Sequence, residues 1–308
     1  MAGLSCAETL GKAGIRTTLF DKGRGPGGRM ASRCIETSQG TAEFDFGAQY
    51  FTVRDVSFAE QVRRWERAGL VAQWPAAGAD AYIGMPTMKV VLQNLCASHS
   101  VHFSSLVKGL VRRGSQWQLA GAANGDEVFD TVVLALPAEQ AAPIMTLHDF
   151  DLARAALYAR SQPCWTGMFV FSEPLAHETG ILRDSGIIAW AAGNRAKPGR
   201  SGPEGWVVQG GPRWSLEHLE QTPDDIGPHL LAALAGETGG TLPDVIGQSV
   251  HRWRYGLSAG TGDGCLWNET LRLGACGDWL VGPRVESAWI SGRLLAEQVI
   301  AASLLAAV

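Results

Sequence analysis

The sequence has few features of a protein that binds nucleic acid or a membrane surface. It contains 26 Lys and Arg against 30 Asp and Glu, which gives a net charge of −4, and no block of basic residues occurs. Binding to nucleic acid needs clustered Lys and Arg, so we do not expect a nucleic-acid partner. A basic amphipathic helix is also missing, which argues against binding to a membrane surface.

The chain is also poor in organised cysteine and histidine. None of its six cysteines forms a CxxC pair or lies at a zinc-ligand spacing from a histidine, and the seven histidines are scattered. We therefore expect no metal site. Single cysteines are typical of a reducing compartment, and the amino terminus lacks the pattern of a signal peptide. We expect a cytoplasmic protein.

No stretch of the chain predicts a membrane span. The most apolar stretch, residues 294–308, is interrupted by Glu297 and Gln298 and is too short to cross a bilayer. The composition is instead typical of a soluble globular protein, with 46% hydrophobic and 18% charged residues. At 308 residues the chain is long enough for two domains and a large core.

The amino-terminal residues predict a helix, a strand and a glycine-rich loop, in that order. Residues 4–12 form the helix, which Gly14 ends, and residues 15–20 form a β-branched strand that ends at Asp21. A loop over residues 23–29 follows. We interpret this order as a βαβ unit that lacks its first strand.

A Rossmann fingerprint has a strand followed by G-x-G-x-x-G at the start of a helix. Here Gly3 can supply only the third glycine, which permits close packing of helix against strand. We therefore expect that Met1 is an internal methionine of an amino-terminally truncated chain, with a strand and two glycines about 8 to 12 residues upstream.

The remaining pattern predicts two domains of different character. Up to residue 149, helices are expected over residues 57–68 and 86–97, and strands over residues 101–103, 106–111, 117–119 and 128–136. From about Phe150, short strands between Gly, Pro and Asn clusters predict an antiparallel sheet, over residues 167–171, 186–191 and 206–209. The expected carboxyl-terminal elements are a helix over 224–238, strands over 249–253 and 271–276, and a helix over 286–307.

These elements indicate an α/β nucleotide-binding domain built from separate segments, with an antiparallel sheet inserted. We assign residues 1–52, 86–149 and 250–308 to the nucleotide-binding domain, and residues 53–85 and 150–249 to a substrate domain.

Charged residues beside the first predicted strand favour a nucleotide ligand. Asp21 lies where an acidic side chain can accept both ribose hydroxyls of an adenosine. In the loop that follows, glycines let the backbone approach a ligand, and Arg24 and Arg29 can neutralise a pyrophosphate. The alternatives are an ordinary turn aspartate and a surface loop with incidental arginines.

Two segments resemble a known family. Residues 21–30, DKGRGPGGRM, resemble the second FAD motif of the flavin amine-oxidase superfamily, in which the arginine of G-G-R contacts the pyrophosphate. Residues 44–52, FDFGAQYFT, resemble the D-x-G-A-Q-Y-F-T signature of bacterial renalase-like oxidoreductases. The resemblance implies that the second segment passes the flavin ring and that Gln49 lies near its reactive edge. A core strand with an incidental glutamine is the alternative.

The carboxyl-terminal part extends the resemblance. Residues 273–279, LGACGDW, are similar to the family's strand followed by Gly-Asp, whose aspartate takes the ribityl hydroxyls. Residues 282–289, GPRVESAW, then open the last helix, and a helix N-terminus stabilises negative charge. In the superfamily this end faces the flavin N1–C2 carbonyl, which becomes anionic on reduction. Arg284 lies near flavin or substrate on this interpretation, or is a surface ion-pair residue.

Residues 251–255, HRWRY, resemble the segment that returns the chain from the substrate domain in renalase-like proteins. His251 is a candidate proton carrier, with a core histidine as the alternative. Side chains alternate along a strand, so Arg252 and Arg254 should face away from His251.

The resemblance as a whole implies a glutathione-reductase-like FAD-binding Rossmann domain with an inserted antiparallel-sheet substrate domain. The candidate catalytic residues are Gln49, His251 and Arg284. The candidate cofactor contacts are Gly3, Asp21, Lys22, Arg24, Gly28, Arg29, Met30, Gln49, Tyr50, Val107, Gly277, Asp278, Ser287, Ala288 and Trp289.

The implied reaction is oxidation of a dihydronicotinamide nucleotide, a dihydro isomer of NAD(P), by hydride transfer to flavin N5. Reoxidation by O2 would yield H2O2. Two alternatives stay open. The 11 tryptophans are compatible with an aromatic cage for an amine substrate. A degenerate nucleotide-binding protein without catalysis is also possible, because the first strand and G-x-G are missing.

Overall fold

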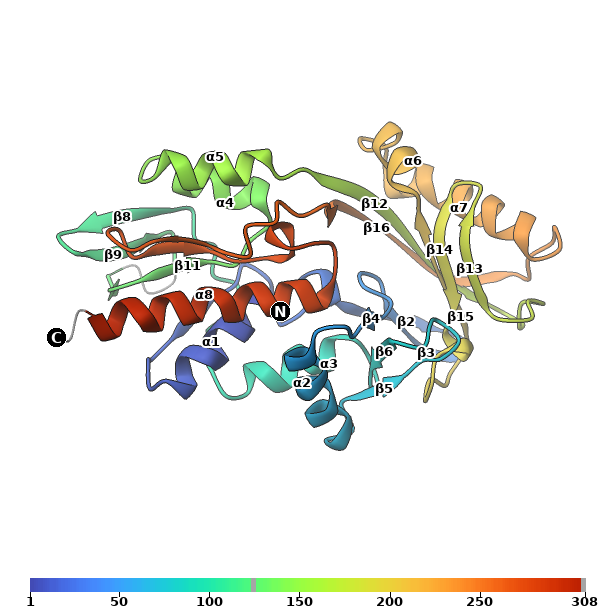
Figure 1. Ribbon diagram of the computed structural model, residues 1–308. Coiled ribbons are helices and arrows are strands. Elements are labelled where there is room, and N and C mark those ends of the chain that lie inside the picture. Colours follow the sequence, from blue (N-terminus) through green and yellow to red (C-terminus); the bar gives the residue numbers. More distant parts are fainter. Residues whose placement is uncertain (123–125, 306–308) are drawn as a thin grey trace. The chain divides into compact units, whose positions relative to one another are not determined.

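The computed structural model describes residues 1–122 and 126–305, and the contacts within it divide the chain into two units (Figure 1). Unit 1 consists of Met1–Pro26, Leu92–Ser161 and Ser258–Val308, and unit 2 of Gly27–Val91 and Gln162–Leu257. Residues 27–52 therefore fold with unit 2, whereas the sequence assigned them to the nucleotide-binding domain. The functional roles of the two domains stay a prediction.

Unit 1 contains two parallel strand pairs. β1 (Thr18–Phe20) is parallel to β7 (Ser100–His102), and β11 (Val132–Leu134) is parallel to β18 (Leu273–Ala275). β17 (Leu266–Asn268) adds an antiparallel strand beside β18. A separate antiparallel sheet has the order β10 (Val128–Phe129), β9 (Gln116–Ala120) and β8 (Gly109–Arg113).

The two parallel pairs belong to separate sheets. β1 lies at the edge of a two-stranded sheet, and β11 at the edge of a three-stranded sheet. A Rossmann sheet connects such pairs through its first strand, which lies between the second and the fourth. Within the described residues, β1 and β11 each have a single strand neighbour.

Helices α1 (Ala2–Lys12) and α8 (Val285–Leu305) lie side by side in unit 1 (Figure 1). Gly292 permits their close approach, because a Cβ there would collide with the Ala2 carbonyl oxygen. The Ser5 hydroxyl donates to the Trp289 carbonyl at 2.7 Å. α8 confirms the helix expected over residues 286–307 as far as Leu305, and residues 306 and 307 lie outside the described chain.

Two of the expected boundaries are wrong. Phe150 does not begin the antiparallel sheet, because the Asp149 carboxylate accepts the Leu152 N–H at 3.0 Å and caps a helix there. The helix expected from Pro86 begins later, at Lys89, because the Met88 N–H donates to the Asp45 carboxylate. The helices concerned are α5 (Phe150–Tyr158) and α3 (Lys89–Cys96), and α4 (Ala138–Met145) precedes α5.

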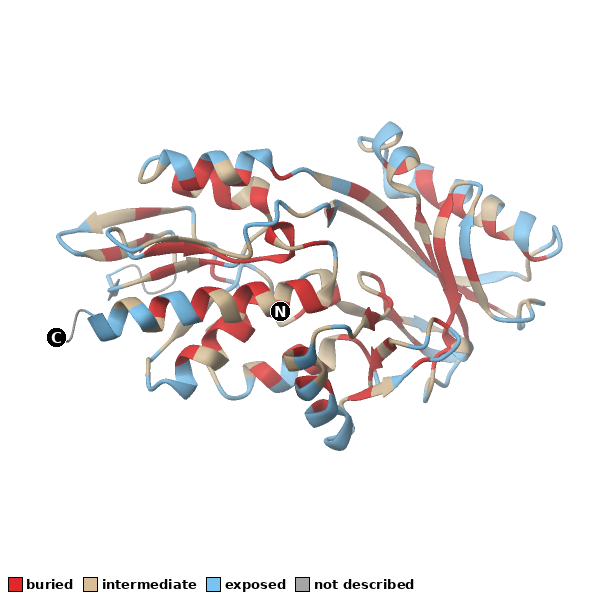
Figure 2. Ribbon diagram, in the orientation of Figure 1, coloured by how far each residue is buried: buried red, intermediate tan, exposed pale blue. Residues whose placement is uncertain are grey.

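Unit 2 contains the expected antiparallel sheet. Its strand order is β13 (Ile181–Ser185), β14 (Ile188–Gly193), β15 (Glu204–Gly210), β12 (Ser161–Phe171) and β16 (Val245–Ser258). Every pair with an assigned register in this sheet is antiparallel. The central strands β12 and β15 are buried over most of their length (Figure 2).

The two faces of this sheet have different neighbours. Helix α7 (Pro223–Glu237) covers one face, where Ile226 and Leu230 pack against Phe169 and Val208. On the opposite face Phe44 and Phe46 pack against Met168, Val170 and Val207. We call this second face the inner face. Side chains alternate along each strand, so Trp190, Gln209 and His251 share it with these apolar residues.

The remaining elements of unit 2 form smaller pieces. They are the hairpin β2 (Ser32–Thr37) with β3 (Gly40–Asp45), the sheet β4 (Phe51–Thr52), β6 (Ala81–Gly84) and β5 (Val71–Gln73), and helices α2 (Val56–Arg67) and α6 (Pro212–Glu217). In the described part of the chain there are also three short 3-10 helices, η1 (Gly28–Met30), η2 (Asn194–Ala196) and η3 (Asp278–Leu280).

Candidate functional site

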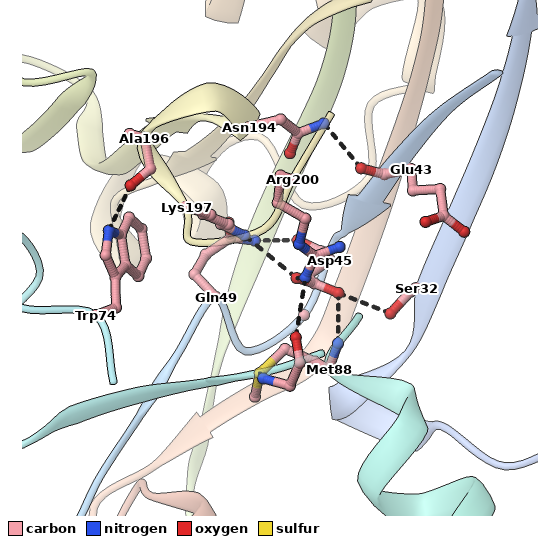
Figure 3. A network of polar contacts seen from close by, with 12 residues as sticks. Ser32, Glu43, Asp45, Gln49, Trp74, Met88, Asn194, Ala196, Lys197 and Arg200 are labelled. Atoms are coloured by element: carbon pink, nitrogen blue, oxygen red, sulfur yellow. Dashed lines mark hydrogen bonds and ion pairs between the residues drawn. The ribbon is translucent and has the colours of Figure 1, made fainter. Parts of the chain in front are cut away.

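The carboxylate of Asp45, at the end of β3, is the centre of a buried polar cluster in unit 2 (Figure 3). One carboxylate oxygen accepts the Ser32 hydroxyl at 2.7 Å and the Met88 N–H at 2.8 Å. The other accepts Arg200 Nη2 at 2.6 Å and Lys197 Nζ at 3.3 Å. The side chains of Asp45 and Lys197 are 0% exposed and that of Arg200 is 4% exposed.

This cluster contains more positive than negative charge, because two cations share one carboxylate. Burial lowers the pKa of Lys197, the attraction of Asp45 opposes that effect, and the neighbouring Arg200 lowers the pKa further. Within the described chain, Nε and Nη1 of Arg200 are buried without a hydrogen-bond partner. The cluster therefore depends strongly on its one carboxylate.

Gln49 is held by the same cluster. Its Nε2 donates to the Asp45 carbonyl, and its Oε1 accepts Lys197 Nζ at 3.0 Å. The side chain is only 3% exposed. Gly47 lets this turn pass the backbone of Arg29, since a Cβ at residue 47 would collide with the Arg29 carbonyl. Both ends of the Gln49 amide thus have partners inside unit 2, and its catalytic role stays a prediction.

Three aromatic rings lie beside this cluster. The Tyr50 ring centroid is 5.0 Å from that of Trp190 and 6.2 Å from that of Trp74, and the two tryptophan rings are 6.0 Å apart. The Arg183 guanidinium lies over Trp190, 4.5 Å from the centroid, and Lys197 Nζ lies 5.7 Å from the centroid of Trp74. Two ring faces are thus already in contact with protein cations.

His251 lies on the inner face among aromatic rings. Its ring centroid is 4.4 Å from that of Trp253 and 5.0 Å from that of Phe46. Burial, and then the positive charge of Arg33, lower the pKa of His251 to about 4. The imidazole is therefore neutral at neutral pH. Its proposed role as a proton carrier stays a prediction.

The expected alternation along this strand is confirmed. Arg252 and Arg254 face away from His251 and form ion pairs with Glu220, at 3.3 Å and 2.7 Å. The guanidinium of Arg252 also lies over Trp165, which belongs to the core on the α7 side of the sheet. These arginines therefore do not share a site with His251.

In unit 1, Asp21 organises the loop that follows β1. One of its carboxylate oxygens accepts the Gly23 N–H at 2.7 Å, and its carbonyl accepts the Ser105 N–H at 2.9 Å. The side chain of Lys22 donates to Gln140 at 3.4 Å. Asp21, Lys22 and Arg24 are all exposed. Their predicted contacts with a cofactor are not blocked by burial.

The G-G-R sequence lies at the start of unit 2, in η1. Gly28 has a φ of 51°, which favours glycine. Arg29 Nη1 donates to the Gly256 carbonyl at 3.1 Å, and Met30 is buried.

Two further predicted cofactor contacts belong to unit 1. Gly3 lies where an added Cβ would come within 3.0 Å of the Ala135 Cβ, which is the close packing expected of a third fingerprint glycine. Val107 precedes β8 and packs partly buried against the core that contains Leu134 and Trp279.

The segment after β18 leads into the amino-terminal end of α8. The Gly277 N–H donates to the Ser291 hydroxyl at 3.0 Å, and Asp278 is buried at the start of η3, which packs against α8. The Ser287 hydroxyl is fully buried and, among the described residues, has no hydrogen-bond partner. Ala288 and Trp289 follow it in the first turns of α8.

Arg284, the third candidate catalytic residue, lies just before α8. Its Nε is 4.0 Å from the Glu286 carboxylate, and its side chain is 37% exposed. This is a weak contact, so the arrangement leaves both the surface role and the predicted role near a ligand open.

No sequence pattern pointed to Lys197, Arg200, Arg183, Trp74 or Trp190. Lys197 and Arg200 lie in a loop rich in Gly and Pro, and the tryptophans read as core residues. Asp45, Gln49 and Tyr50 belong to the recognised motif over residues 44–52, whereas Lys197 and Arg200 come from a distant part of the sequence.

Comparison with known proteins supports the expected architecture. The family model of an NAD(P)-binding Rossmann-like domain matches residues 1–65. The amino-terminal part of the chain is thus similar to an NAD(P)-binding Rossmann-like domain. No helix of the described residues is long and apolar enough to cross a membrane. No group of three or more His, Cys, Asp or Glu in the described chain could hold a metal ion.

Solved structures of similar fold include oxidases. A protein from Exiguobacterium sp. 255-15, provisionally described as a protoporphyrinogen oxidase, has a TM-score of 0.77 at 11% identity, covering 97% of this chain and 96% of its own. Cyclohexylamine oxidase from Brevibacterium oxydans IH-35A has a TM-score of 0.74 at 11% identity, with the same coverage. Putrescine oxidase bound to putrescine has a TM-score of 0.62 at 13% identity and covers 97% of both chains. At these identities the likeness shows the fold.

Replacement of Asp45 by Asn should strongly destabilise the protein. The change leaves two buried cations without their carboxylate, and breaking a buried ion pair in this way costs about 3–5 kcal/mol. Urea unfolding measures the loss. Asp55→Asn is the matched control, because Asp55 is only partly buried, caps α2, and Asn caps a helix as well as Asp does. Equal stability of the two variants would contradict the role given to Asp45.

A second prediction concerns Lys197→Met, which removes one of the two cations that share the Asp45 carboxylate. The pKa of Lys197 is lowered in the folded chain, so the unfolded chain binds the extra proton between that lowered pKa and the ordinary value of 10.5. Stability should therefore rise with pH across that window. Between pH ~7 and ~10, the wild type should gain more unfolding free energy than Lys197→Met.

Proposed function

We propose that this chain is an FAD-dependent, renalase-like oxidoreductase that oxidises a dihydronicotinamide nucleotide, a dihydro isomer of NAD(P), to NAD(P)+. O2 is the proposed electron acceptor, with H2O2 as product. The six cysteines are all free and scattered, which supports a cytoplasmic location. Bound FAD would supply the hydride acceptor.

The residues of unit 1 fit such a cofactor. The buried Ser287 hydroxyl lacks a partner in the described chain and lies in the first turn of a 21-residue helix. A flavin carbonyl that gains negative charge would be stabilised by that helix end. The exposed carboxylate of Asp21 is the proposed contact for the adenosine ribose. Asp278, which follows Gly277, is the proposed contact for the ribityl hydroxyls. Arg29, which belongs to unit 2, is the pyrophosphate contact predicted from the sequence.

One observation carries the choice of substrate, namely the cations on the aromatic rings of unit 2. Arg183, Arg33 and Lys197 lie 4.5, 4.8 and 5.7 Å from the ring centroids of Trp190, Phe46 and Trp74. An ammonium substrate needs free ring faces and a site without positive charge. A dinucleotide carries two negative phosphates, and the positive charge attracts it. The rings therefore favour a nucleotide over an amine.

Amine oxidation is the second candidate function. Two of the solved structures of similar fold are a cyclohexylamine oxidase and a putrescine oxidase. A neutral amine could still contact the Tyr50 ring, for which no cation contact is found in the described residues. The experiment below also tests the non-catalytic alternative, a nucleotide-binding protein that does not hold flavin.

Anaerobic reduction of the purified protein should separate these functions. We expect bound FAD, with rapid bleaching of its absorbance by dihydro-NAD isomers and no bleaching by a panel of primary amines. Bleaching by amines alone would establish the second candidate. A protein that neither retains FAD nor binds it on titration would be the non-catalytic form.

Arg29→Ala tests the proposed pyrophosphate contact. Loss of one charge-assisted hydrogen bond should weaken FAD binding by about 1.5–3 kcal/mol, which is roughly tenfold to a hundredfold in Kd. Equilibrium titration of the flavin-free protein measures this. Arg24→Ala, in the same glycine loop, measures how much the second arginine contributes to the Kd for FAD. An unchanged Kd for Arg29→Ala would rule out contact between Arg29 and the cofactor.

A further inference from the structure

The indole of Trp190 has a buried donor without an acceptor. Its side chain is only 8% exposed, and within the described residues its Nε1–H finds no partner. Six other tryptophans each donate their indole N–H to a protein oxygen, namely Trp74, Trp117, Trp165, Trp206, Trp253 and Trp279. A buried unpaired donor is costly, and an acceptor from a bound ligand would remove that cost at Trp190.

The surroundings of Trp190 indicate the kind of acceptor. Trp190 lies in β14 on the inner face, with the rings of Tyr50 and Trp74 at 5.0 and 6.0 Å. Tyr50 is only half-buried and has no cation contact among the described residues, so its ring offers a face on which a planar ring can stack. The cross-strand neighbour Gln209 donates its own amide to the Gly47 carbonyl at 2.7 Å, which commits that group to the protein.

Positive charge strengthens the donor. The Arg183 guanidinium lies over the Trp190 ring at 4.5 Å and draws electron density from it. A polarised indole N–H prefers an oxygen with high negative partial charge, such as an amide carbonyl. A ligand with a planar ring and an attached amide satisfies both the Tyr50 ring and the donor.

We propose that Trp190 is a specificity-determining residue that donates its indole N–H to the carboxamide oxygen of a dihydronicotinamide ring. This proposal rests on the proposed function and names how the ring is recognised. On this proposal, the aromatic residues Tyr50, Trp74 and Trp190 of unit 2 contact the nicotinamide end of the nucleotide. It also predicts poor binding of dinucleotides without the carboxamide.

The test compares two ligands in the full, FAD-loaded chain. One is NAD+, and the other is the same dinucleotide with an unsubstituted pyridinium ring. Trp190→Phe keeps an aromatic ring and removes the N–H. It should weaken NAD+ binding roughly tenfold and leave binding of the second ligand unchanged. Isothermal titration measures both.

Trp253→Phe is the matched control, because its N–H already donates to the Phe46 carbonyl at 2.7 Å on the same sheet face. It should leave the ratio of the two affinities as in the wild type. If Trp190→Phe weakens binding of both ligands equally, or leaves the preference for NAD+ unchanged, the role given to Trp190 is wrong. Neither result bears on the proposed function. Failure of the wild type both to bind NAD+ and to be reduced by dihydro-NAD isomers overturns the proposed function with it.

Discussion

The Asp45 carboxylate accepts four donors from three separate segments of unit 2, and the local structure depends on this one charge. Ser32 comes from β2, Met88 from the residue before α3, and Lys197 and Arg200 from the loop that follows η2. Without the carboxylate, two buried cations would repel each other across a few ångströms in a medium of low polarity. The same carboxylate fixes where α3 begins and, through Lys197, how Gln49 is held.

The position of charge in unit 2 also constrains its chemistry. Arginine and lysine side chains lie against Trp190, Phe46 and Trp74, so these rings do not resemble an empty cage for a cation. His251, among the same aromatic residues, has its pKa lowered to about 4 and carries no charge at neutral pH. The inner face thus combines neutral aromatic surface with fixed positive charge, which suits a planar ring joined to phosphates.

In unit 1, backbone groups are central to both the packing of α1 against α8 and the polar end of α8. Close packing of α1 against α8 depends on Gly292, where any side chain would collide with the Ala2 carbonyl. The amino-terminal end of α8 provides N–H groups and the unpaired Ser287 hydroxyl among the described residues. A helix end with free N–H groups favours negative charge nearby.

Local sequence determined the elements that have strong periodicity or clear end signals. The helix after Gly3, the loop after Asp21, the antiparallel strands and the alternation of His251 with Arg252 all follow from spacing of residues that are near one another in the chain. The tertiary structure alone decided that Lys197 and Arg200 meet Asp45, that Gln49 is held by Lys197, and that the Trp190 donor is buried without a partner among the described residues. These contacts join residues more than a hundred positions apart, and burial and charge balance depend on the whole neighbourhood, which no short pattern in a single sequence records.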